Sequence, residues 1–189
     1  MPKLSVKVPS KNERVLLDAE AVGQKVRDLA QAIARDFGKN SKALALVGIQ
    51  TRGVPLAHRL AKLLEKSLGH AVPVGTLDIT LYRDDVHTIA DQPQVKETNL
   101  DFDLQDTAVV LVDDVLFTGR TIRSAMNALI DYGRPSCIRL AVLVDRGHRE
   151  LPIGPDYIGL TLATRPEEAV DVRLKEVDSE DRVLLRRKT

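Results

Sequence analysis

The chain has 189 residues, of which 43% are hydrophobic and 29% are charged, a balance that excludes a disordered or fibrous protein. Lysine and arginine number 28 against 27 acidic residues, so the net charge of +1 gives no global case for nucleic-acid binding, and only a local basic patch would support it. A single cysteine excludes an intrachain disulfide, and no apolar stretch approaches the roughly 20 residues of a membrane span. The first residues lack the apolar core of a signal peptide, so we expect a cytoplasmic protein without membrane association.

The first third of the chain predicts a helix, a strand and a second helix. Apolar residues recur at three- and four-residue steps up to Phe37, which indicates a helix that Asp18 caps and Gly38 ends. The apolar run Ala43–Ile49 has the length of a buried strand. Pro55 suits the first turn of the helix that follows.

The rest of the chain continues this alternation. Further strands are expected over residues 72–79, 108–112, 138–144, 157–162, 170–174 and 183–185, and a third helix over 121–132. Pro73 indicates that the first of these strands begins at a sheet edge. Residues 82–99 are polar and aperiodic, which is typical of a lid or binding loop. Apolar strands that alternate with helices predict an α/β fold with a parallel sheet covered on both faces.

The decapeptide 112–121 carries the strongest chemical signal. Asp113 and Asp114 directly follow the predicted strand 108–112, and two adjacent carboxylates are costly to bury without cations or hydrogen-bond donors. The turn from Thr118 to Thr121 opens a helix, and Gly119 lets backbone N–H groups approach an anion there. Acids beside such a turn indicate a ribose phosphate. The alternative is a pair of loop acids that cap the helix, but the whole decapeptide behind an apolar strand favours a site.

The decapeptide resembles the phosphoribosyl pyrophosphate (PRPP) motif of type I phosphoribosyltransferases. The stretches 47–53, 77–85 and 144–153 extend the resemblance over most of the chain and point to the uracil phosphoribosyltransferases that also regulate pyrimidine genes. The resemblance implies the fold of that family, a parallel sheet flanked by helices with a small hood. It also implies one domain over 1–189, with a core of about 18–150 and the hood and C-terminal strands in about 151–189. The resemblance further implies that Mg²⁺ is the cofactor and that the protein assembles as a homodimer or homotetramer.

The resemblance also assigns roles in PRPP binding. Asp113, Asp114 and Arg52 are the catalytic residues that it implies, the acids holding the ribose hydroxyls and stabilising positive charge as the glycosidic bond breaks. No residue is expected to bind Mg²⁺ directly, because PRPP holds the ion and the two acids reach it through water. Arg83 and Lys96 are candidates to close over pyrophosphate, with solvated loop charges as the alternative. The full PRPP set is Thr51, Arg52, Gly53, Arg83, Lys96, Asp113, Asp114, Val115, Leu116, Phe117, Thr118, Gly119, Arg120 and Thr121.

Phe117 bears on the choice of base. In the purine enzymes of the family an acid stands at the matching position, so an apolar ring favours a pyrimidine, although Phe117 also suits a hydrophobic anchor for the loop. By resemblance, Arg146 and the backbone near Val170 complete the base site. The implied reaction joins uracil to PRPP and gives UMP and pyrophosphate, with orotate or a purine as alternative bases. His148 is a candidate for the general base of this reaction.

A second function implied by the resemblance is UMP-dependent binding of the leader RNA of pyrimidine genes. His148 and Arg149 match positions of RNA contact, and Lys25 and Arg27 lie near that region. Four positions oppose this expectation, because they lack the basic residues that are common there: Asp28, Gln31, Gly154 and Leu160. The alternative is a salvage enzyme that does not bind RNA.

Overall fold

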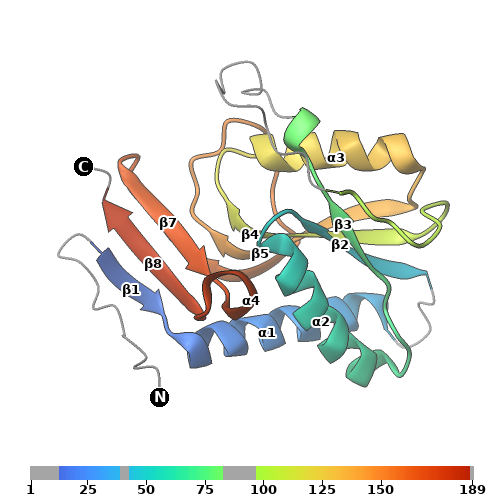
Figure 1. Cartoon of the computed structure of the whole chain (residues 1–189), viewed down its shortest axis with the longest axis horizontal. Helices are drawn as coiled ribbons and strands as arrows, with labels where there is room; N and C mark the ends of the chain where they lie inside the picture. The colour runs from blue at the N-terminus through green and yellow to red at the C-terminus, as the bar shows by residue number, and fades with distance from the viewer. Residues whose placement is uncertain (1–12, 39–42, 83–96, 188–189) are drawn as a thin grey trace.

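The computed structural model describes residues 13–38, 43–82 and 97–187. A parallel sheet of five strands in the order β3-β2-β4-β5-β6 forms the centre of the molecule, and a smaller antiparallel sheet in the order β1-β8-β7 lies beside it (Figure 1). The parallel strands are β2 (Leu44–Ile49), β3 (Val74–Leu77), β4 (Ala108–Leu116), β5 (Cys137–Asp145) and β6 (Tyr157–Thr161). The fold expected from the resemblance is therefore confirmed.

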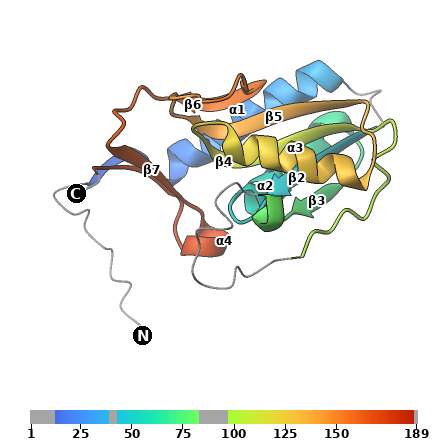
Figure 2. The same cartoon turned by 90° about the horizontal axis from the view of Figure 1, so that it is seen from above.

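The helices cover both faces of the parallel sheet (Figure 2). One core packs α1 (Ala19–Phe37) and α2 (Gly53–Leu68) against one face, and the other packs α3 (Arg120–Tyr132) against the opposite face. The alternation of side chains along β4 supplies both cores, since Val110 belongs to the first and Leu111 to the second. No helix among the described residues is long and apolar enough to cross a bilayer.

The helix boundaries follow the signals in the sequence. The Asp18 carboxylate accepts a 2.9 Å hydrogen bond from the backbone N–H of Ala21 and so caps α1, while Gly38 ends the helix. β3 is shorter than predicted, and it lies at the edge of the sheet, as Pro73 indicated. A short 3₁₀ turn, η1 (Thr80–Tyr82), leads toward residues 83–96, which lie outside the described part of the chain.

The hood differs from the predicted boundaries. It consists of β1 (Glu13–Leu17), β7 (Glu168–Arg173) and β8 (Arg182–Arg187), with the short helix α4 (Lys175–Asp178) between the last two strands. β1 precedes residue 18, because it pairs antiparallel with β8 at the far end of the chain. β6 follows residue 150 but belongs to the parallel sheet, where it pairs with β5. We still interpret residues 1–189 as one domain.

Gly53 begins α2 where the helix approaches the backbone of β4. A Cβ at this position would lie 2.2 Å from the carbonyl oxygen of Val112, so the two backbones approach more closely than any side chain allows. Gly154, by contrast, has no atom within 4 Å of a Cβ built on it. The first turn of α2 is thus held against the residue that precedes Asp113.

We expect Gly53→Ala to lower the free energy of unfolding by about 1–3 kcal/mol, because the backbone must move to admit the methyl group. Gly154→Ala is the matched control and should change stability by less than about 0.5 kcal/mol. Urea unfolding followed by circular dichroism measures both changes. Equal stability of the two variants would contradict the close approach of α2 to β4.

Candidate active site

The two adjacent acids lie within β4 rather than after it. β2 pairs with β4 as far as Gly48 and Val112, whereas β5 pairs with β4 on to Leu116. The sequence predicted an end at Val112, but the ladder continues because β5 extends equally far. Asp113 and Asp114 therefore stand on a part of β4 that projects beyond β2, next to the loop that leads into α2.

The environment of the two carboxyls opposes double ionisation. Asp113 is only 6% exposed, and burial together with the charge of Asp114 raises its pKa well above the usual value. Burial also raises the pKa of Asp114, although the neighbouring Asp113 and Arg52 act against the rise. The backbone N–H of Asp114 donates to Asp113 Oδ1, and that of Val115 donates to Asp114 Oδ1, both at 2.9 Å. Of the two, Asp114 is the carboxyl that an arginine helps to keep charged.

The turn after β4 is fixed by main-chain hydrogen bonds. Gly119 has a left-handed φ of 93° and forms the N-terminal boundary of α3, and it has no side chain to cap the first N–H groups of the helix. The carbonyl oxygen of Thr118 accepts hydrogen bonds from the backbone N–H groups of Glu150 and Leu151, at 2.9 and 3.2 Å. Arg120 forms a 2.6 Å ion pair with Glu150, and Thr121 is exposed in the first turn. A turn held this firmly presents its N–H groups to an anion in fixed positions.

The loop that precedes α2 lies beside the acids. Arg52 is half-buried and donates from Nε and Nη2 to the two carboxylate oxygens of Asp178, at 3.0 and 2.7 Å. This paired contact raises the pKa of Arg52, to which the charge of Asp114 also contributes. Thr51 is exposed and Gly53 is buried against β4. The three residues predicted to grip pyrophosphate therefore lie between Asp114 and the hood.

An aromatic ring, an arginine and a histidine meet just after the end of β4. The guanidinium carbon of Arg146 lies 4.0 Å from the centroid of the Phe117 ring, and the ring of His148 meets Phe117 edge-on at 5.9 Å. Arg146 is only 5% exposed, and burial lowers its pKa. Its Nε donates to Thr164 Oγ1 at 3.2 Å. His148 Nε2 lies 2.6 Å from the carbonyl oxygen of Thr164 and must donate there, so only Nδ1 is left to act as a base.

Three further predicted residues lie apart from this cluster or beyond the described chain. Val170 is half-buried in β7 and packs against the core formed by α1 and α2. Arg83 and Lys96 fall within residues 83–96, so their place is outside the described residues.

Arg149, predicted to contact RNA, is already bonded within the protein. Its Nε donates to the carbonyl oxygen of Ile153 at 2.9 Å, and Nη1 donates to the carbonyl oxygens of Phe117 and Gly147 at 2.7 and 3.3 Å. Its Nη2 forms a 2.6 Å ion pair with Asp145. The guanidinium thus ties the loop after β5 to the turn after β4.

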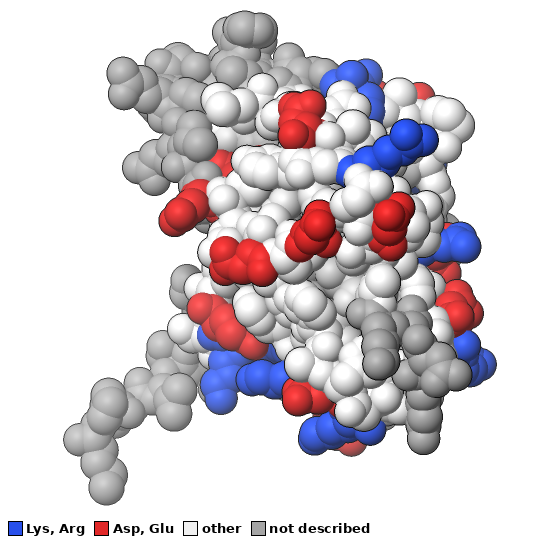
Figure 3. Space-filling model, turned by 90° about the vertical axis from the view of Figure 1, so that its right-hand side faces the viewer, with Lys and Arg blue, Asp and Glu red and all other residues white. Residues whose placement is uncertain are grey.

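The other basic residues predicted for RNA lie on α1 and also have partners. Lys25 is 4.0 Å from the carboxylate of Asp28, and Arg27 donates twice to the amide oxygen of Gln24. Figure 3 shows one side of the molecule, on which acidic side chains lie across the middle and basic side chains at the rim. This side therefore carries no continuous basic patch among the described residues.

The fold, the two acids of β4 and the glycine turn before α3 are those of a phosphoribosyltransferase. The sequence matches the family described as phosphoribosyl transferase domain over residues 14–177, and the chain belongs to this family. It is 55% identical to the bifunctional protein PyrR of Thermus aquaticus over 90% of this chain and 93% of the relative. The bifunctional protein PyrR of Deinococcus radiodurans is 52% identical over 90% and 92% of the two chains. The resemblance predicted from the motifs is confirmed.

Solved structures agree on the fold at much lower identity. A hypoxanthine phosphoribosyltransferase of Trypanosoma cruzi superposes with a TM-score of 0.71 and 17% identity, over 96% of this chain and 94% of that one. A hypoxanthine phosphoribosyltransferase of Staphylococcus aureus gives 0.65 and 20%, over 93% and 92%. These likenesses show the fold alone.

The structure adds site residues that the sequence reasoning missed. Asp178 contacts Arg52, Thr164 contacts Arg146 and His148, and Asp145 contacts Arg149. The acids after β7 were the one signal for Asp178, because a half-buried arginine commonly pairs with a carboxylate.

We expect Asp113→Asn to stabilise the free protein at neutral pH. Burial raises the folded-state pKa of Asp113 above the unfolded value, so stability falls as the pH rises from the unfolded toward the folded value. Asparagine removes this cost, and Tm should rise by about 2–4 °C for each kcal/mol regained at pH 7. The gain should vanish near pH 3, where both carboxyls are protonated in either state.

The control for this prediction is Asp101→Asn, which changes an exposed carboxyl. Differential scanning calorimetry at the two pH values compares the variants with the wild type. A gain for Asp113→Asn that is the same at both pH values, or a loss at neutral pH, would show that Asp113 does not bear the cost of a buried charge.

Proposed function

We propose that the protein is a uracil phosphoribosyltransferase that forms UMP and pyrophosphate from uracil and PRPP. The observation that carries the proposal is that the acidic pair of β4, Phe117 and the turn before α3 follow one another in one short segment, with Arg146 placed over the Phe117 ring. Family membership supports the transfer of a phosphoribosyl group, and the bifunctional relatives support the choice of uracil. We also propose that the protein is cytoplasmic and that it assembles as a homodimer or homotetramer.

In the proposed reaction the bond from the ribose anomeric carbon to pyrophosphate breaks, uracil N1 bonds to that carbon, and the N1 proton passes to water. The transition state resembles an oxocarbenium ion, as in glycoside hydrolysis. Asp114, which Arg52 helps to keep charged, stabilises the positive ribose, and Asp113 accepts hydrogen bonds from the ribose hydroxyls. The N–H groups after Gly119, with the hydroxyls of Thr118 and Thr121, bind the 5′-phosphate.

Pyrophosphate leaves on the side of the Arg52 loop. Arg52 retains N–H donors that its contact with Asp178 does not use, and these suit phosphate oxygens. Arg83 and Lys96 are proposed to close over the same group and exclude water.

The acids of β4 fit a magnesium ion that PRPP carries. Their oxygens are hard ligands of the kind that Mg²⁺ prefers, and the described residues contain no group of three acidic, histidine or cysteine side chains for a protein-only metal site. We therefore propose that Asp113 and Asp114 reach the ion through water, without a direct bond. Bound Mg²⁺ supplies positive charge that stabilises the departing pyrophosphate.

The stack at Phe117 supports a pyrimidine. Phe117 is 37% exposed, so its ring offers apolar surface to a flat base. The Arg146 guanidinium, 4.0 Å from the ring centroid, is proposed to donate to the uracil carbonyl groups. The backbone near Val170 is proposed to close the far side of the base site. Neither Phe117 nor Arg146 provides the carboxyl group that the resemblance assigns to the purine enzymes.

Uracil, orotate, hypoxanthine and xanthine, each supplied with PRPP and Mg²⁺, test the proposed reaction. We expect UMP from uracil and no nucleotide from the other three bases, as measured by chromatography. Asp114→Asn should lower turnover of uracil by roughly 10²–10³-fold, because it removes the charge that faces the cation. Nucleotide formation from a purine alone, or unchanged turnover in the variant, would contradict the assignment.

Phe117→Asp should impair the use of uracil without creating a purine enzyme. A carboxylate at this position would remove the apolar surface and pair with the Arg146 guanidinium, which would then be withdrawn from the base. KM for uracil should therefore rise by at least about tenfold. Phe117→Leu keeps an apolar surface and serves as the control, with a smaller rise. Steady-state kinetics measure both, and unaltered kinetics in Phe117→Asp would show that the ring points away from the base.

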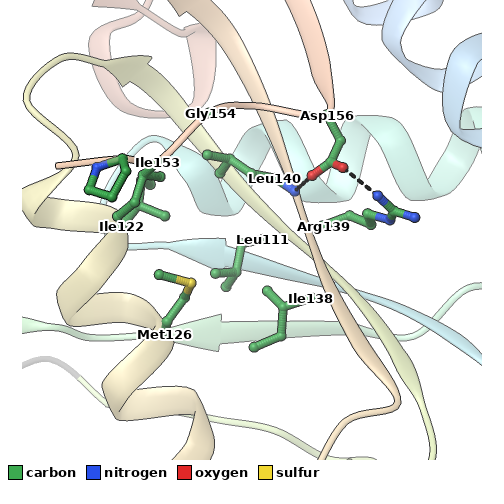
Figure 4. Close-up of a pocket in the computed structure, with 10 residues that line it drawn as sticks. Leu111, Ile122, Met126, Ile138, Arg139, Leu140, Ile153, Gly154 and Asp156 are labelled. Atoms are coloured by element: carbon green, nitrogen blue, oxygen red, sulfur yellow. Dashed lines mark hydrogen bonds and ion pairs between the residues drawn. The ribbon is translucent and has the colours of Figure 1, made fainter. Parts of the chain in front are cut away.

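We also propose UMP-dependent binding of pyrimidine leader RNA, which the bifunctional relatives favour. The basic residues predicted for this contact are engaged within the protein, as described above. A further arginine, Arg139, forms a 2.7 Å ion pair with Asp156 beside a pocket of about 240 Å³ that Gly154 lines (Figure 4). The RNA affinity of the wild type should therefore be low at moderate salt.

Gly154→Arg should tighten RNA binding, because it adds a positive charge where a side chain meets no atom within 4 Å. The slope of log affinity against log salt should steepen by about 0.7–0.9 for each additional RNA phosphate that the variant neutralises. Gly154→Gln is the neutral control. Leu160→Lys is unsuitable, because Leu160 packs against the core. Filter binding at two salt concentrations with UMP measures the effect, and equal binding by both variants would contradict it.

A further inference from the structure

The pair of Arg52 and Asp178 joins the hood to the loop that precedes α2, across 126 residues of sequence. Asp178 ends α4 and is itself held in place, because its Oδ2 also accepts a 2.9 Å hydrogen bond from the backbone N–H of Leu174. Leu174 is buried in the core shared with α1 and α2. The carboxylate is therefore a fixed acceptor and not a mobile surface charge.

The contact uses one edge of the guanidinium. Arg52 donates from Nε and from one hydrogen of Nη2, which leaves both hydrogens of Nη1 and the second hydrogen of Nη2 outside the pair. The next residue along the chain, Gly53, lies against the backbone of Val112 and Asp113, so the loop that carries Arg52 joins the hood to β4. The Arg52 charge also acts on the Asp114 carboxyl. Asp178 thus fixes the rotation of a planar group whose other edge is available to a ligand.

We propose that Asp178 is a positioning residue, which holds Arg52 with its outer edge directed at the pyrophosphate of PRPP. The inference rests on the proposed function, because it concerns how Arg52 meets that substrate. A long arginine side chain without such a partner would have to be ordered at each binding event, and the ordering would weaken affinity.

A contribution to stability does not by itself account for the pair. Both side chains are partly exposed, 32% for Arg52 and 18% for Asp178, so solvent screens the two-point contact and limits its contribution to stability. The Arg52 guanidinium keeps the pKa of Asp178 below its usual value, so the carboxylate is charged at neutral pH and the pair is present when substrate binds.

The chain offers a matched control in a second ion pair between the same two regions. Arg59 on α2 donates to Asp181, which follows α4 and is 19% exposed, at 2.7 and 3.0 Å. Asp181 makes a backbone contact too, since it accepts from the N–H of Lys175 at 2.8 Å. Asp181→Asn therefore perturbs the hood as Asp178→Asn does, but it leaves the partner of Arg52 intact.

The test compares Asp178→Asn, Asp181→Asn and the wild type by calorimetric titration with Mg²⁺-pyrophosphate and by steady-state kinetics with uracil and PRPP. Asp178→Asn should weaken pyrophosphate binding and raise KM for PRPP, each by roughly tenfold, the equilibrium factor of one charged hydrogen bond. KM for uracil and kcat should change by less than about twofold. Asp181→Asn should match the wild type in both assays, even where its Tm falls.

A double mutant separates positioning from a general effect on the hood. Arg52→Gln/Asp178→Asn should bind pyrophosphate no more weakly than Arg52→Gln alone, because Asp178 acts through Arg52. Losses of pyrophosphate affinity that add in the double mutant would overturn the inference. So would an equal loss in Asp181→Asn, or binding by Asp178→Asn that is unchanged or tighter. The titration needs no base and no turnover, so a wild type that binds pyrophosphate but does not use uracil contradicts the proposed function alone.

Discussion

Backbone hydrogen bonds join β4 to β5 beyond the last residue of β4 that pairs with β2. The projecting part of β4 holds the two acids, and its end leads directly into the turn before α3. The loop after β5 returns over that turn and bonds to it through Thr118 and Arg149. The geometry of the acids, the Phe117 ring and the turn before α3 therefore depends on one two-stranded extension of the sheet, which the approach of Gly53 supports from the side of α2.

Local signals made much of this predictable. Asp18 and Gly38 act within one turn of the helix that they bound, and the acids and glycine of the decapeptide are neighbours in sequence, so a short window contains the whole pattern. β1 and the contact of Arg52 with Asp178 were missed for the opposite reason. β1 is a five-residue strand with half-exposed side chains, and its partner lies at the other end of the chain. A single sequence carries no signal for such distant pairing.

The basic residues show a second limit of sequence reasoning, because a charge in the sequence is not a charge available to a ligand. Arg149 bonds to three carbonyl oxygens and a carboxylate, and Arg139 bonds to Asp156. Both serve the loops that hold the turn and β6 in place. The sequence shows that such an arginine is basic, but in this fold its hydrogen bonds and ion pairs join separate segments of the chain.

The order of strands in the hood ties the Arg52 contact to both ends of the described chain. β8 lies between β1 and β7, so the antiparallel sheet forms only when β1 pairs with a strand near the last described residue. The short helix α4, which carries Asp178, lies between β7 and β8. The carboxylate that holds Arg52 is therefore placed by pairing between strands that are separated by most of the described chain.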